Sequence, residues 1–187
     1  MLDFFFKEKK WVLYHGSVFK FNSIDLSRGK PYKDFGKGFY TTRDRNHAIN
    51  LALRNKKIEE MRIKQKNYNS TVTAYIYSYE LDVIKIKDLS VKEFKSADKE
   101  WVLFVLANRK SPDKTHSYDI VIGPTANDDT KLSLRAYFAG AYGELESDKA
   151  INTLLDNIEP DNLPPQIYFG SNKGIELLLL KEGAVAI

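Results

Sequence analysis

Three short segments of the chain place a polar or aromatic side chain beside residues that allow close backbone approach. The first is Leu-Tyr-His-Gly-Ser at residues 13–17, where a short apolar stretch ends at a His-Gly pair. The second is Asp-Phe-Gly-Lys-Gly-Phe-Tyr-Thr-Thr at residues 34–42, whose tyrosine follows a Gly-x-Gly. The third is Pro-Gln-Ile-Tyr-Phe at residues 165–169. An imidazole and an amide can hydrogen-bond a ligand, and a phenol ring can stack on one. Each segment alone is more often structural, so only their joint order favours a site.

The sequence lacks the residues or motifs that most other kinds of catalytic or metal site require. The chain contains no cysteine, which excludes disulfides, thiolate metal sites and cysteine nucleophiles. The fingerprints G-x-G-x-x-G, G-x-x-x-x-G-K-[ST] and G-x-S-x-G are all missing. His15, His47 and His116 lack the spacing of metal ligands, so no metal site is expected. Asp128 and Asp129 could ligate a cation or act as an acid pair, but adjacent loop carboxylates are more often solvated.

The first two segments together resemble the ADP-ribosyltransferase superfamily, and most closely its diphtheria-toxin and poly(ADP-ribose) polymerase branch. In that branch a strand carries a His-Gly pair, and a later Gly-x-Gly-hydrophobic-Tyr segment enters a helix. The third motif usually supplies a glutamate, where this chain has Gln166. The whole chain, including residues 100–101 and 118–124, also looks like a family of small bacterial proteins in this superfamily. Some of these proteins are encoded in toxin–antitoxin or phage-defence operons.

This resemblance implies a split antiparallel β-sheet with flanking helices and a cleft for NAD. It implies NAD-dependent transfer of ADP-ribose to a macromolecular acceptor, a protein or a nucleic acid, by a bacterial toxin with a possible cognate antitoxin. The catalytic residues would be His15, Tyr40 and Gln166. The residues in contact with NAD, the co-substrate, would be His15, Gly16, Ser17, Gly38, Phe39, Tyr40 and Thr41.

The chemistry explains these residue types. Cleavage of the nicotinamide–ribose bond passes through an oxocarbenium-like state, and the leaving group is already cationic, so the protein mainly orients and stabilises. His15 can hydrogen-bond a ribose hydroxyl, and Tyr40 can stack on the nicotinamide. Gly16 can pair its backbone with the carboxamide, because no Cβ blocks the approach. The turn at residues 36–38 would let the chain wrap the ring.

The glutamine at the third motif changes the electrostatics. Gln166 can hydrogen-bond the ribose 2′-hydroxyl through its amide oxygen, but it supplies no charge. At an effective dielectric constant of about 20, one charge lost at about 4 Å is worth on the order of 4 kcal/mol before desolvation. Glu144 or Glu146 could compensate for this loss.

Two alternatives remain open on the same fold. Water could be the acceptor, which would make the chain an NAD glycohydrolase. The chain could instead be a non-catalytic NAD-binding or nucleic-acid-binding module, with a basic surface formed by Arg43, Arg45, Arg54 and the lysines near Lys56. Tyrosines 75, 77 and 79 share one strand face, which could stack RNA bases but is more often an ordinary sheet face.

The composition and charge indicate what kind of protein carries these motifs. Of the 187 residues, 43% are hydrophobic and 29% charged, and the formal net charge is +4. These values are typical of one soluble domain over residues 1–187. The mild positive charge fits a mixed surface, or an acidic partner such as nucleic acid or dinucleotide phosphates. The N-terminal apolar run is too short for a signal peptide or a membrane span, and a cysteine-free chain fits the cytoplasm.

Local patterns predict the elements that must position the motifs. Strands are predicted at residues 12–14, 39–42, 72–81, 83–86, 118–122, 166–169 and 184–187. Helices are predicted at residues 44–66, 98–109, 132–139, 148–158 and 172–180, with a polar loop at 125–130 and a breaker at 159–165. In the first helix Asp44 is the N-cap, and Ala48, Leu51, Ala52, Ile58 and Met61 form the apolar face. The irregular mixture of strands and helices favours an α+β fold.

Overall fold

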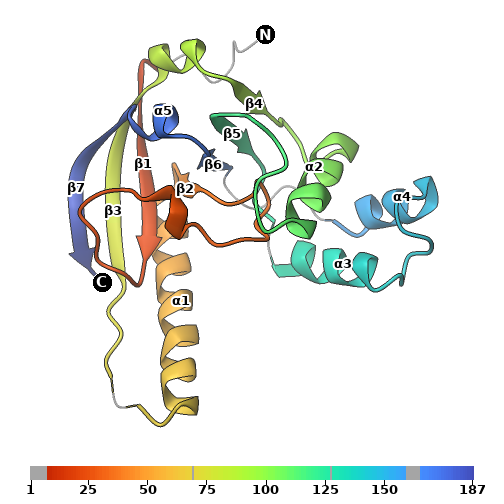
Figure 1. Cartoon of the computed structure of the whole chain (residues 1–187), viewed down its shortest axis with the longest axis horizontal. Coiled ribbons are helices and arrows are strands. Elements are labelled where there is room, and N and C mark those ends of the chain that lie inside the picture. Colours follow the sequence, from red (N-terminus) through yellow and green to blue (C-terminus); the bar gives the residue numbers. More distant parts are fainter. Residues whose placement is uncertain (1–7, 69, 127, 159–164) are drawn as a thin grey trace.

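The computed structural model describes residues 8–68, 70–126, 128–158 and 165–187. Residues 159–164, most of the predicted breaker, lie outside the described residues, and so do the side chains of Asp128 and Asp129. The described chain forms a sheet that helices flank, with α1 on one side and α2, α3 and α4 grouped at one end (Figure 1).

Seven strands form one open sheet. In chain order they are β1 (Lys10–Ser17), β2 (Phe39–Thr42), β3 (Tyr75–Asp82), β4 (Val91–Glu93), β5 (Ile120–Gly123), β6 (Gln166–Phe169) and β7 (Leu178–Ala186). Their order across the sheet is β4-β5-β6-β2-β1-β3-β7, and every neighbouring pair is antiparallel except β4 and β5. The prediction of an α+β fold with a mainly antiparallel sheet is confirmed.

The sheet is weakly joined in its middle. β1 pairs with β3 along its whole length, from Lys10 to Ser17. Between β1 and β2 the register contains a single pair, Tyr14 with Thr42. Beyond that pair the two strands diverge, so within the described residues one edge of β1 after Tyr14 has no strand partner. Edge backbone groups there can bind something other than a strand.

Helix α1 (Arg45–Gln65) is anchored only at its start. As predicted, Asp44 is the N-cap, and its side chain accepts a hydrogen bond from the His47 backbone N–H. The first turns pack on β1 through Ala48 and Ala52. The rest of the predicted apolar face is wrong, because Leu51, Ile58 and Met61 are exposed. Figure 1 shows the reason: α1 runs past the end of the sheet, so its second half has no sheet to pack against.

The other helices lie mostly at the opposite end of the sheet (Figure 1). They are α2 (Lys99–Lys110), α3 (Asp128–Phe138), α4 (Asp148–Asp156) and the short α5 (Asn172–Ile175). Asp98 and Ser147 cap α2 and α4, as hydroxyl and carboxylate side chains commonly do. None of the helices in the described ranges combines the length and the apolar character needed to cross a bilayer.

Alternating side chains of the strands pack into a hydrophobic core on each face of the sheet. Val121 and Tyr168 belong to the core that α2, α3 and α4 cover. Their strand neighbours Ile122 and Phe169 belong to the second core, on the other face. The second core also contains Trp11, Leu13, Tyr77, Tyr79 and Leu81. The burial of two of the three strand tyrosines, Tyr77 and Tyr79, confirms the sheet-face interpretation and removes the proposed RNA-stacking platform.

Several predicted boundaries are wrong. Residues 83–86 form part of the 3-10 helix Val83–Asp88 rather than a strand, because the Asp82 side chain caps its first turn. β4 has only three residues and was not predicted. α3 begins at Asp128, inside the predicted loop at 125–130.

The C-terminal segment shows a change of element type. Residues 172–180 were predicted as one helix, but only α5 is helical. The following residues form β7, which pairs with β3 from Leu178 onward. The open edge of β3 offers backbone partners to this segment, and such pairing overrides a weak helical pattern.

Candidate functional site

A cavity of about 760 Å³ opens where β1 and β2 diverge. Its walls come from the ends of these strands, the long loop between them, the first half of α1 and the start of β6. All eight residues predicted for the site line it: His15, Gly16, Ser17, Gly38, Phe39, Tyr40, Thr41 and Gln166. Small-molecule sites typically enclose roughly 300–1,000 Å³, so the cavity has the size of a ligand site.

His15 bridges the gap between the diverging strands. Its Nδ1 lies 2.7 Å from the backbone oxygen of Tyr40. A carbonyl oxygen only accepts, so Nδ1 donates and Nε2 is the acceptor of the neutral ring. The ring stacks on Phe39, with centroids 4.4 Å apart. Burial lowers the pKa of His15, and the bond to Tyr40 opposes this shift only in part. The side chain therefore offers the cavity a neutral ring with one acceptor nitrogen.

Tyr40 is held by the turn that precedes it. Its hydroxyl donates to the Gly36 oxygen at 2.7 Å and accepts from the Phe35 N–H at 3.1 Å. Burial, followed by the charge of Asp34, raises the pKa of Tyr40 well above its ordinary value. The turn at residues 36–38 was expected to wrap a ligand ring, but its backbone oxygens accept from the hydroxyls of Tyr40 and Tyr168. The ring, and not the hydroxyl, is thus what Tyr40 can offer a ligand.

Packing already explains the glycines of the two motifs. A Cβ at Gly16 would lie 2.2 Å from the Ala48 backbone oxygen of α1. A Cβ at Gly38 would lie 2.3 Å from the Tyr168 ring. Gly36 has a φ of +86°, a conformation that favours glycine. The expected reason for Gly16, close approach of a ligand amide, is therefore not the one that the structure displays: the close neighbour is helix α1.

The remaining predicted residues shape the cavity more than they donate to it. The Ser17 hydroxyl accepts the Phe19 N–H at 2.9 Å. The Thr41 hydroxyl donates to the Ile167 oxygen at 3.2 Å, which ties β2 to β6. Both hydroxyls thus serve the local backbone. What their segments present to the cavity is backbone groups and the aromatic side chain of Phe39.

Gln166 belongs to a buried polar network that the sequence did not reveal. Its Nε2 donates to Asp34 Oδ2 at 2.9 Å and to the Pro124 oxygen at 3.1 Å. Both partners are acceptors, so the orientation of the amide is fixed by chemistry. Arg109 Nε donates to Asp34 Oδ1 at 2.8 Å, and the Ala126 N–H approaches Oδ2 at 3.4 Å. Because both amide hydrogens are used, Oε1 is the polar atom that Gln166 keeps for a ligand.

Two functional candidates were therefore missed, and one expectation is wrong. Asp34 was visible as a lone carboxylate in a glycine-rich aromatic motif, which is a usable signal. Arg109 resembled an ordinary cation in the last turn of a helix, which gives no signal. The expected compensating carboxylates, Glu144 and Glu146, are exposed and do not line the cavity. Glu146 instead pairs with Lys110 at 2.8 Å. The carboxylate next to Gln166 is that of Asp34.

The lining of the cavity is rich in positive charge. It includes Arg28, Lys30, Lys33, Arg54, Arg109 and Lys131, against the carboxylates of Asp25 and Asp34. Desolvation lowers the pKa of Lys33, and the charges of Lys30, Lys131 and Arg109 add to this shift, while Asp34 opposes it. Such a concentration of cations favours an anionic ligand.

The basic surface considered from the sequence is divided in the fold. Arg54 lines the cavity, whereas Arg43 forms an ion pair with Glu8 and lies 4.9 Å from the centre of the Trp11 ring. These arginines therefore do not act as one patch. In the described part of the chain, no group of three or more His, Asp or Glu side chains is placed to hold a metal ion.

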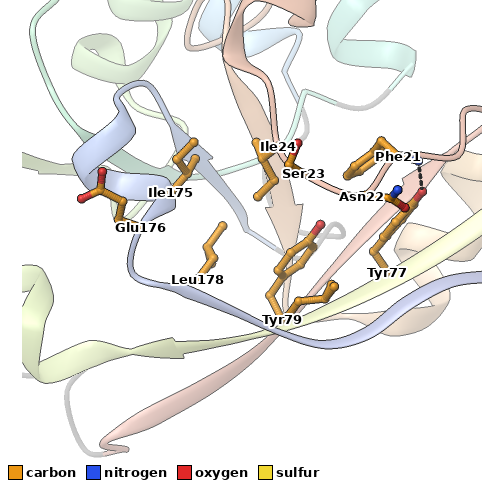
Figure 2. Close-up of a pocket in the computed structure, with 10 residues that line it drawn as sticks. Phe21, Asn22, Ser23, Ile24, Tyr77, Tyr79, Ile175, Glu176 and Leu178 are labelled. Carbon is orange, nitrogen blue, oxygen red and sulfur yellow. Dashed lines mark hydrogen bonds between the residues drawn. The ribbon is translucent and has the colours of Figure 1, made fainter.

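A second, smaller hollow of about 280 Å³ lies between the segment 21–24 and strands β3 and β7. Figure 2 shows Tyr77, Tyr79, Ile175 and Leu178 around it, with the Tyr77 hydroxyl bound to the Phe21 N–H. Its lining is mainly apolar and contains no cation. Because the segment 21–24 contributes to both hollows, it separates them. The larger cavity, with its convergent polar groups, is the candidate functional site.

Comparison with known proteins supplies a family but no activity. Neither the curated proteins nor the solved structures contain a match to this chain. A family model described as "Protein of unknown function (DUF3990)" matches residues 11–180, a span that includes all of β1 but its first residue, the residues lining the cavity, β6 and the start of β7. The chain therefore belongs to the DUF3990 family.

Proposed function

We propose that this protein is an NAD-dependent ADP-ribosyltransferase that modifies a macromolecular acceptor and acts as a bacterial toxin. One observation carries the proposal. Three segments that resemble the superfamily's motifs, from the beginning and the end of the chain, line a single cavity of about 760 Å³. A chance resemblance of short segments gives no reason for them to converge on one ligand-sized space.

Each motif residue has a role that its geometry permits. His15 Nε2 accepts a hydrogen bond from a ribose hydroxyl, since Nδ1 is committed to the Tyr40 oxygen. The Tyr40 ring stacks on the nicotinamide, because its hydroxyl is committed to residues 35 and 36. The edge of β1 after Tyr14 bonds the carboxamide with its backbone. Gln166 Oε1 accepts from the second ribose hydroxyl.

The charge of the cavity supports a dinucleotide. The pyrophosphate of NAD carries negative charge, and the lysines and arginines that line the cavity provide donors for it. The same positive field would attract an acidic acceptor such as nucleic acid. Labelling with NAD, followed by nuclease or protease treatment, distinguishes a protein acceptor from a nucleic-acid acceptor.

The reaction conserves atoms and electrons without a further reactant. The bond between ribose C1′ and the nicotinamide nitrogen breaks, and its electron pair neutralises the pyridinium. A nucleophilic atom of the acceptor then bonds to C1′ and gives up its proton to the solvent. The residues of the cavity hold the sugar and the leaving ring through this step, which is orientation and electrostatic stabilisation. When water takes the place of the acceptor, the same step is NAD hydrolysis.

One observation favours a second candidate, binding of NAD without turnover. Gln166 carries no charge, and the Asp34 carboxylate beside it is ion-paired with Arg109. The wall next to the reacting carbon therefore supplies little net negative charge to a developing cation. A protein with this wall could bind NAD as a sensor.

The test uses NAD labelled separately in the nicotinamide and adenine parts, incubated with the protein and a bacterial extract. Transferase activity releases nicotinamide and leaves adenine label on macromolecules, and nuclease or protease sensitivity identifies the acceptor. Release of nicotinamide with only free ADP-ribose indicates hydrolysis, and binding without release indicates the sensor. Absence of NAD binding by calorimetry contradicts the transferase, the hydrolase and the sensor alike.

Gln166→Ala tests the third motif. It should lose activity about 5- to 150-fold, since a ribose hydroxyl loses its partner. Asp88→Asn, at an exposed position of the 3-10 helix Val83–Asp88 outside the cavity, is the control.

The toxin role has its own test, and it rests on the resemblance to operon-encoded proteins. Induced expression of the wild-type protein should slow bacterial growth, and His15→Ala should relieve the effect. Equal toxicity of the two versions at equal protein levels contradicts an NAD-dependent toxin. A cognate antitoxin would be sought by co-expression of the neighbouring open reading frame.

A further inference from the structure

We propose that Asp34 is a positioning residue for Gln166, and that the two form a donor–acceptor pair that presents an acceptor oxygen to the cavity. The inference rests on the proposed function for the identity of the ligand, a ribose hydroxyl. The pair itself rests only on the geometry of Asp34, Gln166 and their neighbours.

The first step is the orientation of the Gln166 amide. Its nitrogen lies 2.9 Å from Asp34 Oδ2 and 3.1 Å from the Pro124 oxygen. A rotation of the amide by half a turn would place Oε1 against two acceptors. The carboxylate and the carbonyl therefore select one orientation, in which Oε1 is left for a ligand.

The second step is the anchoring of Asp34. Its side chain is only 9% exposed, and it forms an ion pair with Arg109, whose side chain is 18% exposed. Arg109 Nε and the Ala126 N–H bind the two carboxylate oxygens. The partners come from the end of α2 and from the loop after β5, so the carboxylate is fixed from two sides. A fixed acceptor can impose its polarity on the amide of Gln166.

The third step concerns the polarity of the pair. Gln166→Glu would put two carboxylates at the distance that a 2.9 Å hydrogen bond now spans, so one must take up a proton or the pair must separate. Asp34→Asn would instead bring two donors together. The new amide has only one acceptor oxygen, so it cannot present an acceptor to both Arg109 and Gln166. Combining both changes restores one donor and one acceptor, with the polarity exchanged. The double variant should therefore be better than either single variant.

The experiment is a double-mutant cycle on the full chain with Asp34→Asn, Gln166→Glu and the combination, and Asp88→Asn as a control for the lost charge. Thermal unfolding and NAD calorimetry are the readouts. Each single variant should lower Tm by about 3 to 10 °C. Each should also lower NAD affinity about 5- to 150-fold. The double variant should recover at least half of both losses. Recovery is incomplete because the Pro124 oxygen would face an acceptor and the Ala126 N–H would face a donor.

The outcomes separate this inference from the proposed function. Additive losses in the double variant overturn the pair, and so does wild-type NAD affinity in Asp34→Asn. If Asp34→Asn unfolds while the double variant folds, the result supports the pair. If the double variant also unfolds, Asp34 serves only as the structural ion-pair partner of Arg109, and the pair is overturned. Wild-type protein that does not bind NAD contradicts the proposed function, while the Tm cycle still decides whether Asp34 and Gln166 are coupled.

Discussion

The two walls of the cavity are fixed by different physics. On the β1–β2 side, His15 and Tyr40 are held by aromatic contacts and by hydrogen bonds to the backbone, one for His15 and two for Tyr40. On the β6 side, Gln166 is held by a buried ion pair whose members come from distant parts of the chain. The first wall is local and neutral, and the second is long-range and charged. A change on the charged wall should therefore affect folding as well as binding, whereas changes on the neutral wall can separate the two.

The largest expected effect is on the charged wall. Arg109→Leu removes the partner of the buried Asp34 carboxylate and should lower the free energy of unfolding by about 3 kcal/mol, since an uncompensated charge remains. This corresponds to a fall in Tm of about 6 to 12 °C. Lys110→Leu is the matched control, because its ion pair with Glu146 is exposed and should be worth less than about 1 kcal/mol. Equal effects of both changes in thermal unfolding would contradict a special role for the buried pair.

Tyr40 tests whether binding and stability separate on the neutral wall. Tyr40→Ala removes the ring and should weaken NAD binding about tenfold. Tyr40→Phe keeps the ring and should leave affinity within about threefold. It should still lower Tm by about 2 to 8 °C, because the Phe35 N–H and the Gly36 oxygen lose their partner. Calorimetry and thermal unfolding check both variants. If the two variants bind NAD equally weakly, the ring is not the contact.

His15 gives the neutral wall a pH dependence. Burial lowers the pKa of His15 below its ordinary value of 6.5, so the unfolded chain takes up a proton at a pH where the folded chain resists it. The stability from this group is present above that value and is lost as pH falls toward the folded pKa. Protonation also turns Nε2 from an acceptor into a donor, so NAD affinity should fall at a lower pH, as pH drops through the folded-state pKa of His15.

Titration calorimetry for NAD affinity and thermal unfolding for stability, from about pH 5 to pH 8, check the His15 prediction in wild type and His15→Ala. The comparison is needed because burial also lowers the pKa of His47 and of His116. The alanine variant should lose part of the dependence on pH in both affinity and stability. Identical pH profiles for the two proteins would show that another group governs binding.

The smallest effect is expected outside the cavity. Glu144→Gln and Glu146→Gln should change nicotinamide release less than about twofold and should leave the thermal stability nearly unchanged, because both residues are exposed. A rate assay on both variants checks this. A large loss of activity would show that these carboxylates act in the site, and it would contradict the proposed role of Asp34.

The elements that carry the motifs were largely predictable. The strands at 39–42 and 166–169 and the Asp44 cap follow from local patterns, and the structure has all three at the predicted residues. The end of β7 agrees with the strand predicted at 184–187, but its first residues were not predictable from their own pattern, because their pairing depends on the open edge of β3. The exposed positions Ile58 and Met61 were also missed, because the length of the sheet decides where α1 loses its cover.

By itself the sequence determined which side chains could meet a ligand: His15 at the end of a strand, Tyr40 after a Gly-x-Gly and Gln166 at the start of a strand. Only the tertiary structure decided what those side chains can still do. Asp34 and Gln166 are 132 positions apart, and Arg109 is 75 positions from Asp34. Hydrogen-bond polarity is a property of the assembled pair, so a glutamine becomes a directed acceptor only when the fold brings a carboxylate to its nitrogen.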